Sequence, residues 1–161
     1  MSDKPIAIVT GGAGFIGSHM VDVLVDHGYR VRVIDNLIGG REDNIAHHMG
    51  SGDVEFSNAD IRSYQPGDSY FDGVKFVFHF AGIGDIVPSI EQPMEYMSAN
   101  VQGTVNMLEC SRIAGVSKFV YASSSSCYGL ADVPTGEDHP IDTKYPYALS
   151  KYQGEQAAFH W

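Results

Sequence analysis

The sequence predicts a single α/β domain built on a doubly wound parallel sheet. Two observations predict this fold: short segments rich in apolar, β-branched and aromatic residues recur at wide intervals, and stretches with helical spacing separate them. Strands that alternate with helices imply parallel pairing and right-handed crossovers. The length of 161 residues, with 43% hydrophobic and 19% charged residues, suits one globular domain with its own core.

Five strands are expected. Their apolar residues are consecutive and do not alternate strictly with polar ones. Such continuous runs are typical of strands that are buried on both faces of a parallel sheet. The expected strands cover residues 6–10, 31–35, 54–57, 76–80 and 119–122.

Helical spacing is clearest in two of the intervening stretches. The link at residues 65–72 is too polar and too marked by Gly and Pro for us to expect a helix there. The two helical sets are Ile16, Met20, Val23 and Leu24, and then Met97, Val101, Val105 and Leu108.

A last helix begins near Tyr147 and still continues when the sequence stops at Trp161. It carries no Gly or Pro stop signal. We therefore expect residues 1–161 to be one domain, the N-terminal part of a longer protein.

Composition excludes several classes of partner. The formal net charge of −10 argues against nucleic acid, which needs a clustered basic surface. No apolar run approaches the roughly 20 residues that span a bilayer, and the start lacks the apolar stretch of a signal peptide. Cys110 and Cys127 share no metal-ligand spacing and are expected to be reduced thiols. We expect a cytoplasmic protein without a membrane segment.

The histidines give no strong indication of a metal. His47 and His48 are adjacent, so they do not easily aim at one ion, and no carboxylate partner is evident nearby. We interpret them as part of a solvated loop and expect no bound metal. His79 lies within the fourth expected strand and is interpreted as a hydrogen-bonded core residue.

A glycine-rich segment, TGGAGFIG at residues 10–17, follows the first strand and opens the first helix. Gly11 permits a sharp turn, Gly14 lets a pyrophosphate approach the backbone, and Gly17 lets the helix pack close to the sheet. The positive end of the helix would then face the phosphates. A purely structural turn is the alternative, but the strand before and the helix after it favour a Rossmann-type dinucleotide site.

Asp35 ends the second strand, where a carboxylate can bind both ribose hydroxyls and repel a 2′-phosphate. NAD is therefore favoured over NADP. Arg41 follows in the loop and slightly weakens this preference.

Tyr147 and Lys151 are four residues apart, so they lie on one face of the last helix. A nearby ammonium favours a phenolate and so makes the tyrosine a better base. Alone, this pair is more typical of a solvated helix face. The four serines at residues 123–126 favour a catalytic role for the pair, because they follow the fifth strand, at the sheet edge where ligands bind. A serine-rich loop that satisfies local backbone groups is the alternative interpretation.

Taken together, these segments resemble the extended short-chain dehydrogenase/reductases, in their NAD-dependent nucleotide-sugar epimerase and dehydratase branch. The resemblance covers residues 6–155. Its motifs are TGGAGFIGSH (10–19), DNL (35–37), DI (60–61), HFAG (79–82), the stretch 93–104, SSSSCYG (123–129) and PYALSK (146–151).

The resemblance implies a set of cofactor-binding residues. Phe15 and Ile16 would cover the pyrophosphate, and Asp60 and Ile61 would hold the adenine. The other positions expected at or beside the cofactor are Gly11, Gly14, Gly17, Asp35, Asn36, Phe80, Ala81, Gly82, Asn100, Tyr147 and Lys151.

The resemblance also implies the chemistry. Tyr147 would be the acid/base, Lys151 would bind the nicotinamide ribose, and Ser124, four residues before the Tyr-Gly pair, would carry the catalytic hydroxyl. The expected reaction inverts C4 of a UDP-hexose-type nucleotide sugar through a transient 4-keto intermediate, with NAD regenerated in each turnover.

Two alternatives stay open. A 4,6-dehydratase or decarboxylase usually carries an acidic residue where this chain has Ser126, so 4-epimerisation is favoured. A dinucleotide-binding module without turnover would not need the tyrosine, lysine and serine. Gly84 stands where some galactose-type epimerases have a larger residue, so the substrate subtype stays open. Family members are often homodimers, and we expect the 161-residue chain by itself to have little or no activity.

Overall fold

Residues 4–161 are described by a computed structural model, in which five parallel strands form one sheet in the order β3-β2-β1-β4-β5. The predicted strands are confirmed, each end lying within two residues of its expected position. Of the predicted domain, residues 1–3 lie outside the described part. The strands are β1 (Ile6–Thr10), β2 (Arg30–Asp35), β3 (Val54–Asn58), β4 (Val74–His79) and β5 (Lys118–Tyr121).

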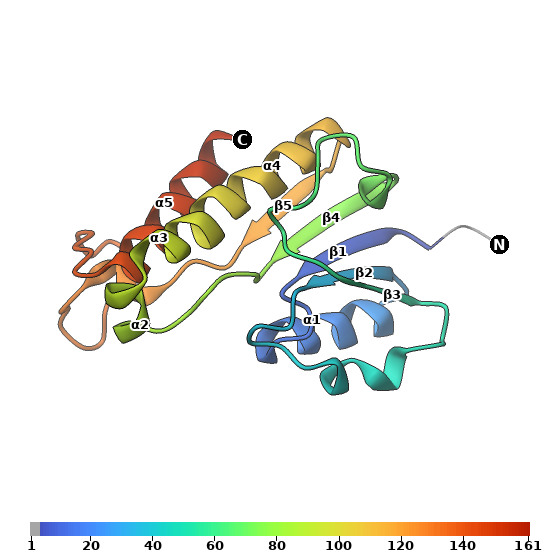
Figure 1. Ribbon diagram of the computed structural model, residues 1–161, viewed down its shortest axis with the longest axis horizontal. Coiled ribbons are helices and arrows are strands. Elements are labelled where there is room, and N and C mark those ends of the chain that lie inside the picture. The colour runs from blue at the N-terminus through green and yellow to red at the C-terminus, as the bar shows by residue number, and fades with distance from the viewer. Residues whose placement is uncertain (1–3) are drawn as a thin grey trace.

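Helices cover both faces of the sheet, as a doubly wound fold requires. Figure 1 shows α1 (Phe15–Asp26) against one face, and α4 (Gly103–Ile113) and α5 (Pro146–His160) against the other. Two short helices, α2 (Val87–Glu91) and α3 (Pro93–Tyr96), precede α4. The predicted helices around Ile16–Leu24 and from Tyr147 onward are therefore confirmed.

The strand β1 supplies both hydrophobic cores. Ile8 points to the α4 side and packs in a cluster with Met107, whereas Ala7 and Val9 point to the α1 side and pack with Val21. All five side chains are fully buried. Successive side chains of a strand point to opposite faces, so a run of apolar residues is what a central strand with two covered faces needs.

The helical segment predicted from Met97 to Leu108 has a more complex form. A π-helix, Met97–Gln102, joins α3 to α4. The wider turn of a π-helix cannot be read from apolar spacing, and such turns occur frequently at functional sites. The link at residues 65–72 forms only a 3₁₀ turn, Ser69–Phe71, as its composition led us to expect. Further 3₁₀ turns cover Glu42–Asn44, Ala46–His48 and Ser125–Tyr128.

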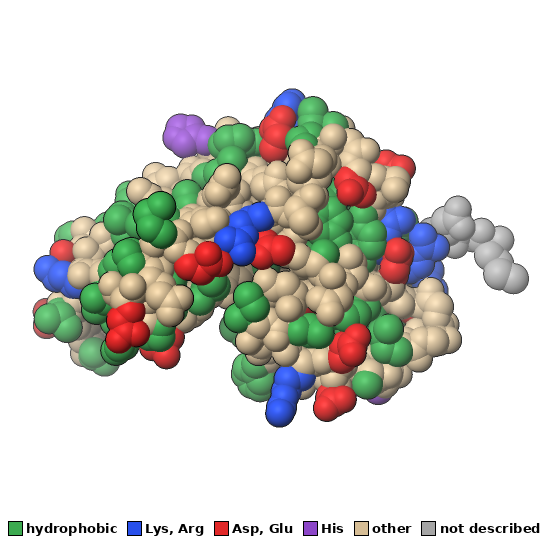
Figure 2. All heavy atoms as spheres, in the orientation of Figure 1, with side chains coloured by type: hydrophobic (Ala, Val, Ile, Leu, Met, Phe, Trp, Pro, Cys, Tyr) green, Lys and Arg blue, Asp and Glu red, His purple; other side chains and the backbone are tan. Residues whose placement is uncertain are grey.

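Bulk properties of the surface agree with the composition. Figure 2 shows basic side chains interspersed among acidic ones on the visible face. Among the helices of residues 4–161, none combines the length and apolar character needed to cross a bilayer. Cys110 and Cys127 are free thiols, and both are buried.

Candidate active site

Two adjoining cavities lie at the carboxyl ends of the strands. The first encloses about 390 Å³ and is lined by the ends of β1 and β2, the start of the segment after β3 and the segment after β4. The second encloses about 330 Å³ and extends to α5. Both are lined by Gly11, Gly14, Phe80 and residues 82–84, so they form one trough over the glycine turn. This is where the strand order reverses, between β1 and β4, which is the usual ligand-binding crevice of such sheets.

Two glycines of the turn, Gly11 and Gly17, have no room for a side chain. A Cβ on Gly11, whose φ is +67°, would lie 2.7 Å from the backbone nitrogen of Ala81. A Cβ on Gly17 would lie 2.1 Å from the carbonyl oxygen of Gly11. The close packing brings the start of α1 directly to the end of β1.

The start of α1 is built to receive an anion. Gly14 precedes the helix without a capping side chain, and the first turn contains no acidic residue. The first N–H groups of a helix have no partner within it, so here they remain available to a ligand. A pyrophosphate fits this donor set.

Asp35 lines the first cavity from the end of β2. The residue is 6% exposed, and its carboxylate accepts hydrogen bonds from the backbone N–H of Ala13 (3.0 Å) and of Leu37 (2.8 Å). These two bonds hold the side chain in place, and each oxygen keeps a free lone pair for a ribose hydroxyl. Arg41 does not line this cavity, and the arginine that does, Arg62, is paired with Asp60.

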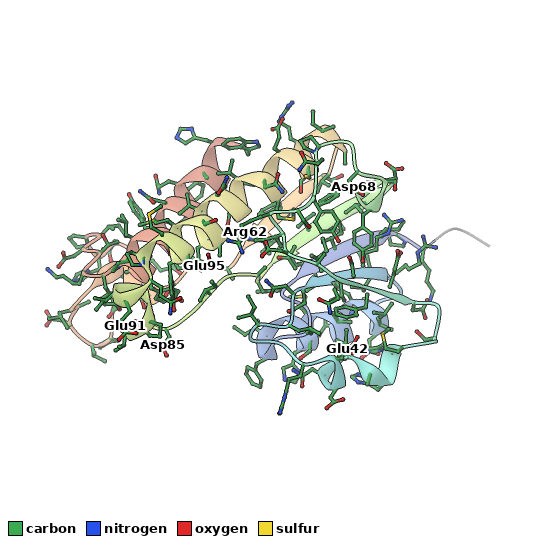
Figure 3. All side chains as sticks on the ribbon, in the orientation of Figure 1. Glu42, Arg62, Asp68, Asp85, Glu91 and Glu95 are labelled. Carbon is green, nitrogen blue, oxygen red and sulfur yellow. The ribbon has the colours of Figure 1, made fainter. Side chains whose placement is uncertain are left out.

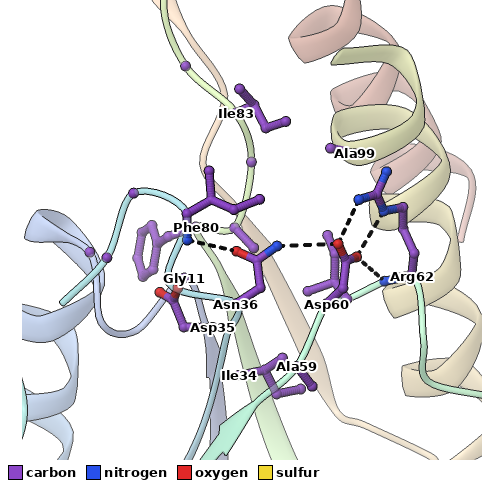
Figure 4. Close-up of a pocket in the computed structure, with 18 residues that line it drawn as sticks. Gly11, Ile34, Asp35, Asn36, Ala59, Asp60, Arg62, Phe80, Ile83 and Ala99 are labelled. Carbon is purple, nitrogen blue, oxygen red and sulfur yellow. Dashed lines mark hydrogen bonds and ion pairs between the residues drawn. The ribbon is translucent and has the colours of Figure 1, made fainter. Parts of the chain in front are cut away.

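An ion-pair network closes the far end of the first cavity (Figure 4). Asp60 accepts three hydrogen bonds from Arg62, including one of 2.6 Å from Nη2, and a fourth of 3.2 Å from Asn36. Arg62 also donates to Ser98 Oγ, in the π-helix (2.9 Å), and forms an ion pair with Glu95 of α3 (Figure 3). Hydrogen bonding to Arg62 lowers the pKa of Asp60. Sequence reasoning predicted Asp60 but missed Arg62, although its place two residues after the aspartate was a signal.

The segment after β4 forms the shared wall of both cavities. Phe80 and Gly82 line both cavities and Ala81 lines the first, and the neighbouring Ile83 and Gly84 also line both. The spacing of Gly82 and Gly84 was a possible signal for a wall that a ligand approaches closely.

Asn100 lies beside the trough, against the wall segment. It is 1% exposed and lines neither cavity. Its side-chain oxygen accepts from the N–H of Ile83 (2.7 Å), and its amide donates to the carbonyl of Ile83 (3.0 Å) and to Ser150 Oγ (2.9 Å). Asn100 therefore ties the wall segment to the π-helix and to α5, a positioning role and not a direct contact.

The two predicted hydroxyls lie together beside the second cavity, which is lined by Tyr147 and Ser123 but not by Ser124 itself. Tyr147 Oη and Ser124 Oγ are 3.5 Å apart, although the residues come from α5 and from the loop after β5. Lys151 lies one turn further along α5 and lines the same cavity with Tyr147. Phe15 and Ile16, both largely exposed, line the opposite side.

Lys151 is buried, and its ammonium makes a cation–π contact. Nζ lies 4.4 Å from the centre of the Tyr121 ring and has no hydrogen-bond partner within residues 4–161. Burial lowers the pKa of Lys151 to about 8. The group thus keeps its proton at neutral pH and has free donors for a ligand in the cavity.

His79 is a core residue, as expected, within an ordered hydrogen-bond chain. The Thr104 hydroxyl donates its one proton to the carbonyl of Asn100 (2.6 Å). Its oxygen must therefore accept the hydrogen bond with His79 Nε2 (3.0 Å), which carries the ring proton. Nδ1 must then accept from Thr10 (2.8 Å), whose oxygen accepts from the N–H of Ala81. Burial lowers the pKa of His79 to about 3, so the ring is neutral and is not a base for the reaction.

His47 is exposed, but one part of the expectation for His47 and His48 was wrong, namely that no carboxylate partner lies nearby. Both imidazoles contact the carboxylate of Asp22, which lies far away in sequence on α1. The fold, and not the local sequence, supplies the carboxylate partner that the prediction lacked.

Fold and site together define a dinucleotide-binding α/β domain with a paired serine and tyrosine beside the nucleotide trough. The chain matches the NAD dependent epimerase/dehydratase family over residues 7–161, and it belongs to that family. The resemblance inferred from the motifs is therefore confirmed.

Relatives and solved structures are of several kinds. A Methanocaldococcus jannaschii protein with a provisional UDP-glucose 4-epimerase name is 43% identical over 152 residues, which are 92% of this chain and 48% of that protein. The UDP-glucose 4-epimerase of Bacillus subtilis is 35% identical, over 92% of this chain and 45% of the relative. The chain thus spans about half the length of these curated relatives.

Among solved structures, a UDP-N-acetylglucosamine 4-epimerase from Methanobrevibacter ruminantium has a TM-score of 0.87 at 30% identity, covering 97% of this chain and 49% of that one. A dTDP-glucose 4,6-dehydratase from Streptomyces venezuelae, solved with NAD, has a TM-score of 0.86 at 34% identity, covering 94% and 50%. Epimerases and dehydratases therefore share this half of the fold.

Proposed function

We propose that this chain is the NAD-binding domain of a nucleotide-sugar 4-epimerase that acts on UDP-hexoses. The observation that carries the proposal is the 3.5 Å approach of Ser124 Oγ to Tyr147 Oη, a residue that lines the second cavity. UDP-glucose 4-epimerases among the relatives support the substrate class.

NAD fits the trough as a whole. The start of α1 would hold its pyrophosphate, Asp35 its adenosine ribose, and Asp60 and Ile61 would border its adenine. Lys151 and Tyr147 would lie at the nicotinamide end. When bound there, NAD supplies a reversible acceptor for the hydride at C4 of the sugar.

The chain's own residues would handle the proton of the sugar 4-hydroxyl. Tyr147 would take it and later return it, while Ser124 would hydrogen-bond the same oxygen as it becomes a carbonyl. The ammonium of Lys151, protonated at neutral pH, would favour the phenolate of Tyr147 during the transfer. Free donors on Lys151 would also bind a ribose hydroxyl.

Ser126 favours epimerisation over dehydration. Elimination of water from C5 and C6 needs an acid beside the sugar, and a serine hydroxyl does not ionise near neutral pH. The backbone N–H of Ser126 donates to Ser124 Oγ (3.2 Å), so this residue helps to fix the catalytic hydroxyl.

Replacing Tyr147 by Phe should lower kcat for interconversion of UDP-glucose and UDP-galactose by about 10²- to 10⁴-fold, because a positioned acid/base contributes that much. Ser124→Ala should also lower kcat. The measurement is product formation by NMR with the intact protein, and bound NAD should be retained in both variants.

Tyr152→Phe is the matched control, since Tyr152 follows Lys151 on α5 but lines neither cavity. It should keep wild-type kcat. Full activity in Tyr147→Phe, or a 4-keto-6-deoxy product from the wild type, would overturn the proposed reaction.

We also propose that the protein acts in the cytoplasm as a homodimer joined through α4 and α5. Exposed apolar side chains on these helices, Ile113 and Phe159, support this surface. A mass in solution of twice that of the intact chain is expected by light scattering, and replacing Phe159 by Glu should give the monomer mass.

A further inference from the structure

We propose that Asp22, His47 and His48 form a binding site for a divalent transition-metal ion such as Zn²⁺. His19 lies near Asp22 but outside this three-residue cluster, and it would complete the site as a fourth ligand after rotation of its side chain. The nearest ligand atoms of Asp22, His47 and His48 lie within 4.8 Å of one another. The site is separate from the trough, because none of the four residues lines either cavity.

Two elements build the cluster. His19 and Asp22 are three residues apart on α1 and so lie on one face of it, and the 3₁₀ turn Ala46–His48 brings the other two histidines. His47 Nε2 and His48 Nε2 lie 2.9 Å and 2.7 Å from the same oxygen, Asp22 Oδ1. His19 Nδ1 lies 3.8 Å from Asp22 Oδ2.

The spacing is close to what an ion needs. Ligand atoms around a tetrahedral ion with bonds of about 2.0–2.1 Å are roughly 3.3 Å apart. The Asp22–His47 and Asp22–His48 distances therefore need to open by only about half an ångström. Side-chain rotation supplies this, because the side chains of Asp22 and His47 are 37% and 56% exposed.

The donor set favours a transition metal over Mg²⁺ or Ca²⁺, since imidazole nitrogen suits Zn²⁺, Ni²⁺ and Cu²⁺ and the hard cations prefer oxygen. Within residues 4–161, every ion pair of Asp22 is with a histidine, so no lysine or arginine competes for its carboxylate. Cys110 and Cys127 are buried and offer no rival site.

The backbone around the cluster is already fixed. Ile45 is fully buried in the core on the α1 side, directly before the 3₁₀ turn. The amide of Asn44 donates to the carbonyl of Ala13 (2.7 Å), which lies just before α1. A bound ion would thus join α1 to the segment between β2 and β3 without refolding either, and should raise the unfolding temperature.

The test is calorimetric titration of ZnCl₂ into the intact, tag-free protein after treatment with EDTA. One ion per chain is expected, with affinity at least tenfold lower in Asp22→Asn, His48→Gln and His47→Gln. Co²⁺ should give the visible absorption of a nitrogen- and oxygen-ligated site, and this absorption should be lost in the same variants. MgCl₂ should give no comparable binding.

His160→Gln is the matched control, because His160 is exposed at the end of α5, outside the cluster. It should bind Zn²⁺ like the wild type. If Asp22→Asn fails to fold, the exposed His47→Gln decides the question. Equal affinity in all variants, or the lack of saturable binding, would overturn the proposal and leave a hydrogen-bonded cluster only.

Discussion

Gly17 faces the carbonyl oxygen of Gly11 so closely that a methyl group there would meet it at 2.1 Å. Gly17→Ala should push α1 away from the turn. We expect a loss of about 1–3 kcal/mol in the free energy of unfolding, as for other overpacked sites, and NAD affinity at least tenfold weaker. Urea unfolding and calorimetric titration of NAD measure the two effects.

The control for this substitution is Gly39→Ala. Gly39 has open space where its Cβ would lie, and its φ is not in the left-handed region. The free energy of unfolding should stay within about 0.5 kcal/mol of the wild type. Equal destabilisation by the two substitutions would show that the contact with Gly11 is not the cause.

At the scale of elements, the π-helix is the feature that holds the wall of the trough. Asn100 lies within it and makes two hydrogen bonds with Ile83. Asn100→Ala removes both and leaves buried backbone groups unpaired, which should cost about 1–3 kcal/mol. The loosened wall should also lower NAD affinity, measured by titration with the folded variant.

Ser150→Ala is the control that distinguishes loss of wall positioning from a general loss of hydrogen bonding around Asn100. It removes one hydrogen bond of Asn100, on the α5 side, and leaves both bonds with Ile83. NAD affinity should stay near that of the wild type. A similar loss of affinity in Ser150→Ala and Asn100→Ala would contradict the positioning role.

Elements with strong apolar patterns were predictable, and those set by tertiary contacts were not. The buried strand β1 was predicted with its bounds, because its residues must be apolar on both faces. The π-helix was missed because apolar spacing does not reveal it. The hydrogen bonds of its Asn100 are made to distant residues such as Ile83, and such bonds leave no periodic pattern in the sequence. Asp22 was missed as a partner of His47 and His48 for the same reason.

At the scale of the whole molecule, His79 should make stability depend on pH. Its pKa is about 3 in the folded protein and about 6.5 when exposed. Between these two pKa values the unfolded chain is protonated at His79 and the native state is not. The free energy of unfolding therefore falls as the pH falls from about 6.5 toward 3. At pH 5 this loss should be about 2 kcal/mol relative to pH 7.5.

Urea unfolding at the two pH values measures this loss, and His79→Leu provides the comparison. The variant has a lower stability at pH 7.5 but should lose about 2 kcal/mol less on going to pH 5. Identical losses in both proteins would mean that His79 titrates normally in the fold.

The candidate site was largely predictable at this scale too. Parallel strands with one common carboxyl edge must bring Gly11, Asp35 and Ser124 to the same side of the sheet. The sequence could not reveal how the two sides of the trough are tied together, since Arg62 and Asn100 act through contacts with residues far along the chain.

The central place of β1 has a consequence for synthesis on the ribosome. Ile6 pairs with Arg30 on one side and with Val74 on the other, so its second neighbour is made about 40 residues after the first. At translation rates of about 5–20 residues per second, one edge of β1 stays open for roughly 2 to 9 s. During that time the nascent strand, apolar on both faces, presents an unpaired edge on which another chain could pair.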